Sequence, residues 1–263
     1  MAFRPRGHTT LITGASSGLG AEFARVFAAR GSNLVLVARR LGRLDELAAE
    51  IRAEHDVTVL VIAMDLARPE AGDALKARLD AESVTIDTLI NNAGFGTIDR
   101  FVNEDRKRLA EELQLNVATL VDLTHIFLPE IVRAGRGAVV NLASTAAYQP
   151  NPTMAVYGAS KSFVLNFTIA LALEMQQSSV KILALSPGPT QTEFFAVAKT
   201  NLAVSQQTPQ QVIAVAMRAL DARNTPSHVV AGRSNSFSAA VVGLLPKPFA
   251  ARIAGNMLTG RRV

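Results

Sequence analysis

The sequence predicts one α/β domain built on a doubly wound parallel β-sheet of about seven strands, with helices on both faces. Short runs rich in Val, Ile and Leu alternate with longer segments of helical period, which is typical of βαβ units. A glycine-rich turn follows the first apolar run. The 263 residues, 49% of them hydrophobic, can form one large core, so residues 1–263 are treated as a single domain.

Seven apolar runs are the expected strands, because each is short and bounded by turn-forming residues. In chain order they cover residues 9–13, 33–38, 57–63, 88–91, 138–143, 180–186 and 228–232. The segments between successive strands are long enough for the helical crossovers that parallel neighbours require. A parallel sheet is therefore favoured.

Several of the intervening segments have a helical period. They are expected to form helices over residues 19–30, 43–53, 106–133 and 153–177. The first ends at Gly31, where glycine can act as a C-terminal cap. A further helix is expected to begin at Pro69, because proline favours the first helical turn. The long stretch 106–133 is expected to break near Asn116 and Pro129.

Composition excludes several kinds of site. The chain has no cysteine, which excludes disulfides, thiolate nucleophiles, iron–sulfur clusters and Cys-ligated zinc. Its histidines show no metal-ligand spacing, so no metal site is expected; they are His8, His55, His125 and His228. The net charge of +5 favours anionic partners such as nucleotide phosphates. Basic residues are scattered and no nucleic-acid-binding motif is found, so no nucleic-acid partner is expected.

The N-terminal residues lack the apolar core of a signal peptide. We also find no apolar run near the roughly 20 residues that span a bilayer. The sequence therefore predicts a cytoplasmic protein without a transmembrane segment.

The turn after the first strand has the features of a nucleotide site. It lies between a strand and a helix, where glycine lets the backbone approach a pyrophosphate and the helix N-terminus offers free N–H groups. The expected contacts are Gly14, Ser16, Ser17, Gly18, Leu19 and Gly20. A tight turn without a ligand is the alternative.

The end of the second strand indicates which dinucleotide binds. A carboxylate there would bind the ribose 2′-hydroxyl of NAD, but the sequence has Ala38, Arg39 and Arg40. A guanidinium favours a 2′-phosphate, so NADP(H) is the expected cofactor and Arg39 the expected contact. Both arginines could instead be merely exposed. Asp65, followed by Leu66, is expected to accept a hydrogen bond from the adenine amino group, unless it caps a helix.

A phenol and an ammonium group are spaced for proton transfer. Tyr157 and Lys161 lie four residues apart, hence one turn apart on the same helix face. We expect the Lys161 charge to lower the pKa of Tyr157 and make it a general acid or base. Ser144, at the end of the fifth strand, is placed to orient a substrate oxygen.

These motifs together resemble those of the short-chain dehydrogenase/reductase family, a group of Rossmann-like oxidoreductases, over at least residues 9–192. The resemblance rests on Thr13-Gly14-x-x-x-Gly18-x-Gly20, Asn91-Asn92-Ala93-Gly94, Asn116, Ser144, Tyr157-x-x-x-Lys161 and Pro187-Gly188-Pro189-Thr190-x-Thr192. Each motif is modest by itself, but their order and spacing are specific.

The resemblance implies roles for further residues. Lys161 would hold the nicotinamide ribose, and Asn116 would anchor a water that relays protons to Lys161. Asn92, Ala93 and Gly94 would line the adenosine side of the cofactor. The nicotinamide carboxamide would contact Thr192 and the backbone after Pro187, including Gly188 and Thr190. Family members assemble through their two long helices, so a homodimer or homotetramer is expected.

Two segments bear on the substrate. Residues 190–207 form the longest stretch without an assigned element and are a candidate lid. Phe194 and other apolar residues in it favour an apolar substrate, although these side chains could equally shield the core. The C-terminal extension, residues 234–263, is apolar and basic. We expect it to close the core or contact a second subunit, with a weak membrane-surface contact as the alternative.

The sequence thus predicts an NADP(H)-dependent oxidoreductase that interconverts a ketone and a secondary alcohol. The expected substrate is a small-molecule carbonyl or alcohol compound, with an apolar oxoacyl, steroid-like or aromatic ketone favoured. A non-catalytic NADPH-binding regulatory protein is one alternative, which would require a disrupted Ser-Tyr-Lys triad. A methyltransferase is the other, but it gives no reason for the pairing of Tyr157 with Lys161.

Overall fold

A seven-stranded parallel sheet forms the centre of the computed structural model, which describes residues 3–194, 198 and 206–259. The strand order is β3-β2-β1-β4-β5-β6-β7, and every adjacent pair is parallel. The strands are β1 (Thr9–Thr13), β2 (Asn33–Ala38), β3 (Val59–Ala63), β4 (Thr88–Asn91), β5 (Ala138–Leu142), β6 (Lys181–Ser186) and β7 (His228–Val230). The order reverses between β1 and β4, where ligands bind in open α/β sheets.

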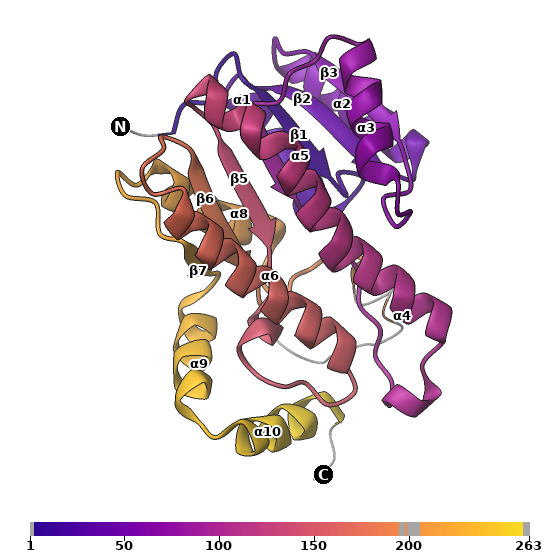
Figure 1. Ribbon diagram of the computed structural model, residues 1–263, viewed down its shortest axis with the longest axis vertical. Helices are drawn as coiled ribbons and strands as arrows, with labels where there is room; N and C mark the ends of the chain where they lie inside the picture. The colour runs from indigo at the N-terminus through magenta and orange to yellow at the C-terminus, as the bar shows by residue number, and fades with distance from the viewer. Residues whose placement is uncertain (1–2, 195–197, 199–205, 260–263) are drawn as a thin grey trace.

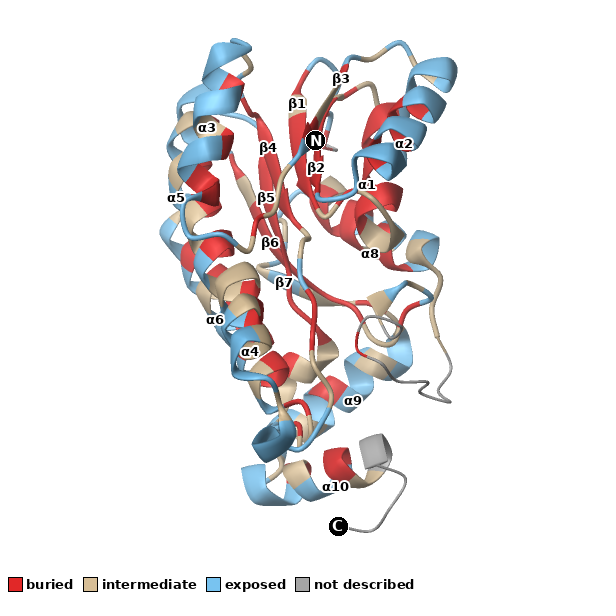
Figure 2. Cartoon of the chain, turned by 90° about the vertical axis from the view of Figure 1, so that its right-hand side faces the viewer, coloured by how far each residue is buried: buried red, intermediate tan, exposed pale blue. Residues whose placement is uncertain are grey.

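Helices cover both faces of the sheet, as Figure 2 shows in side view. One face packs against α1 (Gly18–Ala29), α2 (Leu41–Glu54) and α8 (Pro209–Asp221). The opposite face packs against α3 (Ala71–Ala81), α5 (Thr119–Ala134) and α6 (Ala155–Glu174). Each face has its own buried apolar cluster, which is why the strands read as continuous hydrophobic runs. The doubly wound fold expected from the sequence is confirmed.

Further elements gather beyond the carboxyl ends of the strands (Figure 1). They are the short helices η1 (Phe101–Asn103) and η3 (Thr145–Tyr148), α4 (Arg106–Leu113), α9 (Arg233–Leu244) and α10 (Lys247–Thr259). Helices α9 and α10 follow the last strand and occupy most of the C-terminal extension. That extension is therefore a wall at the ligand-binding end of the sheet.

Element boundaries differ from the expected ones at a few places. Strand β3 begins at Val59, and α3 begins at Ala71 rather than Pro69. The prediction that Pro69 opens the helix is wrong because Pro69 lies in a turn, closed by the Ala71 N–H group donating to the Arg68 carbonyl. Strand β7 also ends early, at Val230.

The expected break in the long helix is a single π-helical turn, η2 (Gln114–Ala118), between α4 and α5. It contains Asn116 and widens the helix without ending it. Pro129, in contrast, lies inside α5, which continues to Ala134 and is capped by Gly135 at φ 64°. The break near Asn116 is confirmed, and the one near Pro129 is wrong.

Two helical stretches, Arg106–Ala134 and Ala155–Glu174, are long and apolar enough to span a bilayer by length and composition alone. The expectation that no apolar run approaches that length is therefore wrong. In the structure α5 and α6 pack against the sheet through strands β4 to β6. Their apolar faces are accordingly explained by core packing, with 39% of each window buried.

Candidate active site

A cleft of about 1250 Å³ lies at the carboxyl ends of the strands. Such a volume exceeds that of a usual single-ligand pocket, so a dinucleotide and a substrate can share it. Most of the residues expected at the site line this cleft: Gly14, Ser16, Ser17, Gly18, Leu19, Arg39, Asp65, Leu66, Asn92, Ala93, Gly94, Ser144, Tyr157, Lys161, Pro187, Gly188, Thr190 and Thr192. Gly20 and Asn116 do not line it. Among the described residues, no group of His, Asp or Glu side chains is arranged to hold a metal.

The glycine-rich turn is shaped by its backbone. Gly14 and Gly18 have φ values of 66° and 55°, a region that other residues rarely adopt. Asn92 donates from its amide nitrogen to the carbonyl of Gly14, which fastens β4 to the turn. A methyl group on Gly20 would lie 2.3 Å from the Gly14 carbonyl oxygen, so Gly20 permits close packing beneath the turn. Helix α1 begins without a side-chain cap, so its first N–H groups are available to a phosphate.

Two arginines line the cleft beside the glycine-rich turn. Both side chains are exposed, and Arg40 reaches over the turn and donates to Ser16 at 3.0 Å and Ser17 at 2.9 Å. Arg40 also forms an ion pair with Glu193 at 2.8 Å, which lowers the pKa of that carboxyl. Sequence reasoning selected Arg39, but Arg40 is the arginine that contacts the nucleotide turn. A sequence at a strand end does not show which side chain turns inward.

Asp65 accepts a hydrogen bond from the Ala67 N–H group at 3.1 Å. This contact closes the turn after β3, so one carboxylate oxygen serves the local backbone. Asp65 and Leu66 nevertheless both line the cleft. Their expected contact with adenine remains a prediction.

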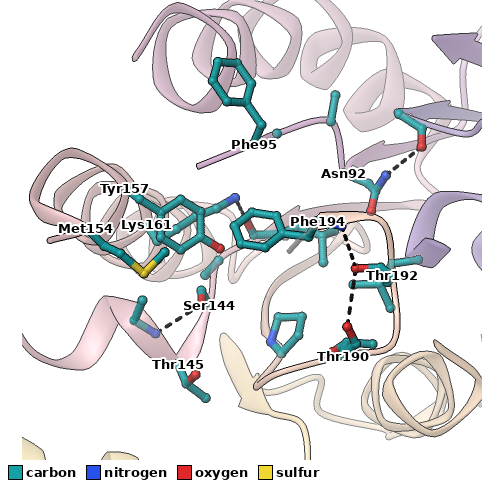
Figure 3. Close-up of a pocket in the computed structure, with 18 of the residues that line it drawn as sticks. Asn92, Phe95, Ser144, Thr145, Met154, Tyr157, Lys161, Thr190, Thr192 and Phe194 are labelled. Carbon is teal, nitrogen blue, oxygen red and sulfur yellow. Dashed lines mark hydrogen bonds between the residues drawn. The ribbon is translucent and has the colours of Figure 1, made fainter. Parts of the chain in front are cut away.

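Tyr157 and Ser144 lie together at the inner end of the cleft (Figure 3). Tyr157 is buried on α6, and the Phe194 ring lies beside it with 5.2 Å between ring centroids. Ser144 follows β5, where its hydroxyl accepts from the Ala146 N–H group at 3.1 Å. The Ser144 hydroxyl is close enough to the Tyr157 phenol to lower its pKa. The two hydroxyl groups can therefore bind one substrate oxygen between them.

Burial raises the pKa of Tyr157 to about 12, although the nearby Ser144 hydroxyl opposes this. Burial likewise lowers the pKa of Lys161 to about 8. The expectation that Lys161 lowers the pKa of the phenol is wrong for this structure. Lys161 donates to the Leu142 carbonyl at 2.6 Å, and its Nζ atom is 5.9 Å from the Tyr157 ring centroid. Loss of water is the largest influence on the pKa of Tyr157, and the neutral phenol is the stable form.

The Asn116 side chain ties the helix to the loop after β4. Its amide oxygen accepts from the Phe95 N–H group at 3.1 Å, and its nitrogen donates to the Phe95 carbonyl at 2.8 Å and to Ser160 at 3.2 Å. The side chain is buried and positions the loop behind Lys161. The water relay implied by the family resemblance stays a prediction.

The candidate lid and the C-terminal extension both contribute to the cleft. The ends of the candidate lid are joined, because Gln191 and Gln207 share a backbone hydrogen bond of 2.9 Å. Residues 195–197 and 199–205 of that segment lie outside the described residues. Helices α9 and α10 supply an apolar wall of the cleft, formed by Phe237, Ala239, Val241, Val242, Leu245, Ile253 and Ala254. Part of the C-terminal extension therefore faces the cleft.

Sequence comparison decides the family. Residues 8–203 match the model of short chain dehydrogenases. The chain belongs to the short-chain dehydrogenase/reductase family. It is thus an oxidoreductase acting on alcohol or carbonyl substrates with a nicotinamide dinucleotide, NAD or NADP, as the resemblance implied.

Known relatives cover most of the chain. A sulfoacetaldehyde reductase of Chromohalobacter salexigens is 40% identical over 185 residues, which are 70% of this chain and 72% of that protein. A short-chain dehydrogenase from Sphingobium yanoikuyae in complex with NADPH superposes with a TM-score of 0.79 at 36% identity, covering 90% of this chain and 94% of that one. A 7β-hydroxysteroid dehydrogenase superposes with a TM-score of 0.85 at 26% identity, covering 97% and 99%.

Proposed function

We propose that this short-chain dehydrogenase uses NADP(H) to interconvert an apolar ketone and a secondary alcohol, with Tyr157 as the general acid and base. The observation that carries the proposal is the buried pair of hydroxyl groups on Tyr157 and Ser144, which meet at the inner end of a cleft large enough for cofactor and substrate. A regulatory protein without activity would not need this pair, nor would a methyltransferase.

The cofactor would lie along the cleft from the glycine-rich turn to Tyr157. When bound, the nicotinamide supplies or accepts the hydride of the reaction. The uncapped start of α1 fits a pyrophosphate, and Lys161, buried beside Tyr157, fits the nicotinamide ribose. Thr192 and the backbone from Gly188 to Thr190 line the part of the cleft assigned to the carboxamide.

The preference for NADP(H) rests on charge. No carboxylate follows β2, and Arg39 and Arg40 both line the cleft. Arg40 already lies over Ser16 and Ser17, which gives a 2′-phosphate one guanidinium and two hydroxyl groups. Glu193 now pairs with Arg40, and a phosphate would compete with that carboxylate for the guanidinium.

In the reductive direction the protein's own groups move one proton. The substrate carbonyl oxygen accepts hydrogen bonds from Ser144 and Tyr157. Because Tyr157 is protonated at neutral pH, it can donate its proton as negative charge develops on that oxygen. Oxidation of an alcohol follows the same path in reverse.

An apolar substrate fits the far end of the cleft. The side chains there come from α9 and α10, and Phe237 is 73% exposed. The 7β-hydroxysteroid dehydrogenase that superposes over nearly the whole chain is named for a steroid, which is a large apolar molecule. Two sulfoacetaldehyde reductases, named for a small charged aldehyde, align over 70% and 85% of this chain, so the choice rests on the apolar side chains of the cleft. We favour the bulkier class.

We further propose a homodimer or homotetramer assembled through the α4–α6 surface, and a cytoplasmic location. Four large apolar side chains are exposed on these helices, namely Leu113, Val132, Phe163 and Leu173. A second subunit would remove them from water, which stabilises an assembly. Sedimentation analysis of the purified protein tests this expectation.

The test of the function is a substrate panel. Bulky apolar ketones, oxoacyl thioesters and small charged aldehydes are each mixed with the protein and NADPH or NADH, and the loss of reduced-cofactor absorbance is followed. We expect faster loss with NADPH and with bulky ketones. If no carbonyl compound is reduced with either cofactor, the proposal fails.

A further inference from the structure

A short loop after β4 packs against Asn116, Lys161 and Tyr157. A methyl group on Gly94 would lie 2.9 Å from the Asn116 side-chain oxygen and 3.5 Å from Lys161 Nζ. One on Gly96 would lie 2.8 Å from the Tyr157 ring. The backbone at these two positions therefore packs directly against Lys161 and Tyr157. Residues 94–97 are called the backing loop below.

Two side chains of the neighbouring helix hold the backing loop. Asn116 binds both backbone polar groups of Phe95. Glu112, one helical turn earlier, accepts a hydrogen bond from the Thr97 N–H group at 3.1 Å. The two contacts fix the loop at its middle and its end, so the packing against Tyr157 depends on them.

Glu112 is an unusual residue to find at this place. It is fully buried, and its second carboxylate oxygen has no hydrogen-bond partner among the described residues. Leaving such an oxygen unpaired in the interior is destabilising. Neither the proposed reaction nor the packing of α4 explains why the chain keeps a carboxyl group there.

We propose that Glu112 is a positioning residue of the active site. Its side chain holds the backing loop against Tyr157 and Lys161, and its negative charge acts electrostatically on both of them. The inference rests on the proposed function, in which Tyr157 carries the proton. The charge acts through space and Glu112 touches neither substrate nor cofactor, because it does not line the cleft.

The electrostatics of the pair support the inference. The charge of Glu112 raises the pKa of Tyr157 and opposes the lowering of the pKa of Lys161. Burial raises the pKa of Glu112 itself to about 7. The other charged groups that act on Glu112 are Glu104, which raises its pKa further, and Arg108, which lowers it.

The charge of Glu112 affects the pH range in which Tyr157 can donate its proton. Above about pH 7 Glu112 is ionised and keeps Tyr157 protonated, so the enzyme retains its proton donor as the solution becomes more basic. Without that charge the phenol would ionise at lower pH. Reduction would then be lost earlier on the basic side, and oxidation, which needs the phenolate, would begin earlier.

The chain offers a direct measurement of this effect. It has two tyrosines and no tryptophan, so Tyr148→Phe leaves Tyr157 as the one tyrosine that absorbs as a phenolate in the ultraviolet. In this background Glu112→Gln removes the charge but keeps an oxygen for the Thr97 N–H group. Glu111→Gln removes a neighbouring carboxylate that is partly exposed, and is the matched control.

We expect Glu112→Gln to shift the Tyr157 titration down by at least about half a pH unit. At one basic pH, with the fold verified by circular dichroism, the phenolate fraction would then be about threefold higher. Glu111→Gln should match the parent. Equal titrations for Glu112→Gln and the parent would overturn the proposal. If the amide variant does not fold, Glu112→Met gives the same comparison, since an apolar chain of similar size often replaces a buried charge well.

A kinetic measurement distinguishes this proposal from the proposed function. With a working ketone, the basic limb of the kcat profile for reduction should move to lower pH in Glu112→Gln, while KM changes little because the cleft is untouched. A merely structural role would lower kcat equally at every pH. If the wild-type protein reduces no carbonyl compound, the proposed function fails, yet the phenolate titration still decides the electrostatic role of Glu112.

Discussion

The two ends of the cleft are built in different ways. The nucleotide end is formed by the glycine-rich turn, which follows β1, and by Arg40, which follows β2. Arg40 donates hydrogen bonds to Ser16 and Ser17 of that turn. The substrate end is formed by α9 and α10, which are apolar and come from the last part of the chain. The nucleotide end thus depends on polar groups in short segments beside the first two strands. The substrate end depends on the packing of helices from the far end of the chain. Tyr157 lies where the two meet.

The largest expected effect is the loss of turnover when Tyr157, between the two ends of the cleft, is replaced. Tyr157→Phe removes the proton donor and keeps the ring, so turnover should fall by about 10² to 10⁴, the contribution of general acid catalysis. NADPH affinity, which depends on the nucleotide end, should stay near the wild-type value. Turnover is followed by NADPH oxidation, and affinity by the quenching or enhancement of NADPH fluorescence. Wild-type turnover in this variant would exclude Tyr157 from the reaction.

The second effect concerns NADPH binding and tests which arginine contacts the 2′-phosphate at the nucleotide end. Arg40→Ala should weaken NADPH binding by about 10- to 100-fold, because a charged hydrogen bond contributes about 1.5 to 3 kcal/mol. Affinity for NADH, which has no 2′-phosphate, should hardly change. Titration calorimetry measures both. Arg39→Ala is the matched comparison, and a larger loss there would restore the assignment made from the sequence alone.

The third effect is a dependence of protein stability on pH through Glu112, which holds the backing loop behind Tyr157. Glu112 has a folded-state pKa of about 7, raised from an ordinary value near 4.5. The folded protein therefore holds this proton more tightly than the unfolded chain does. Stability is greatest below about pH 4.5 with respect to this group, and falls as the pH rises toward 7.

Over that window the wild type should lose up to about 3 kcal/mol relative to Glu112→Gln, which has no such proton. Urea unfolding of both proteins at several pH values measures the difference. Parallel stability curves for the two proteins would show that Glu112 has an ordinary pKa. In that case the negative charge at the backing loop would already be present in weakly acidic solution.

The smallest effect belongs to the substrate end. Phe237→Ala removes a large apolar side chain that is 73% exposed and lines the cleft. We expect KM for a bulky ketone to rise by about 3- to 10-fold, as expected from losing part of an aromatic contact. KM for a small ketone should change less than twofold. Equal changes for both ketones would mean that the α9 wall does not contact the substrate.

The contrast between the two ends also explains what the sequence could predict. Strands and crossover helices follow from local period, and the glycine-rich turn is recognisable because strand, turn and helix are consecutive. The spacing of Tyr157 and Lys161 likewise places them on one helix face without any knowledge of the fold. Local order in the chain was sufficient for each of these features.

Other features depend on contacts between distant residues. The pKa of Tyr157 is set by burial beneath segments such as that of Phe194, and a sequence does not show the loss of water. Which arginine reaches Ser16 is decided by side-chain direction. Glu112 contacts Thr97 across a loop, so its role becomes visible only in the fold. Helix α8 was missed although Thr208-Pro209-Gln210-Gln211 forms a capping box, a local signal that could have identified its start.

The most direct test of the central claim is a crystal structure with NADPH and an unreactive ketone analogue bound together. Our account predicts that the analogue's oxygen lies within about 3.2 Å of both the Tyr157 and Ser144 hydroxyl groups, beside the nicotinamide ring. The apolar part of the analogue should lie against α9. An oxygen bound elsewhere, with Tyr157 turned away from the nicotinamide, would contradict it.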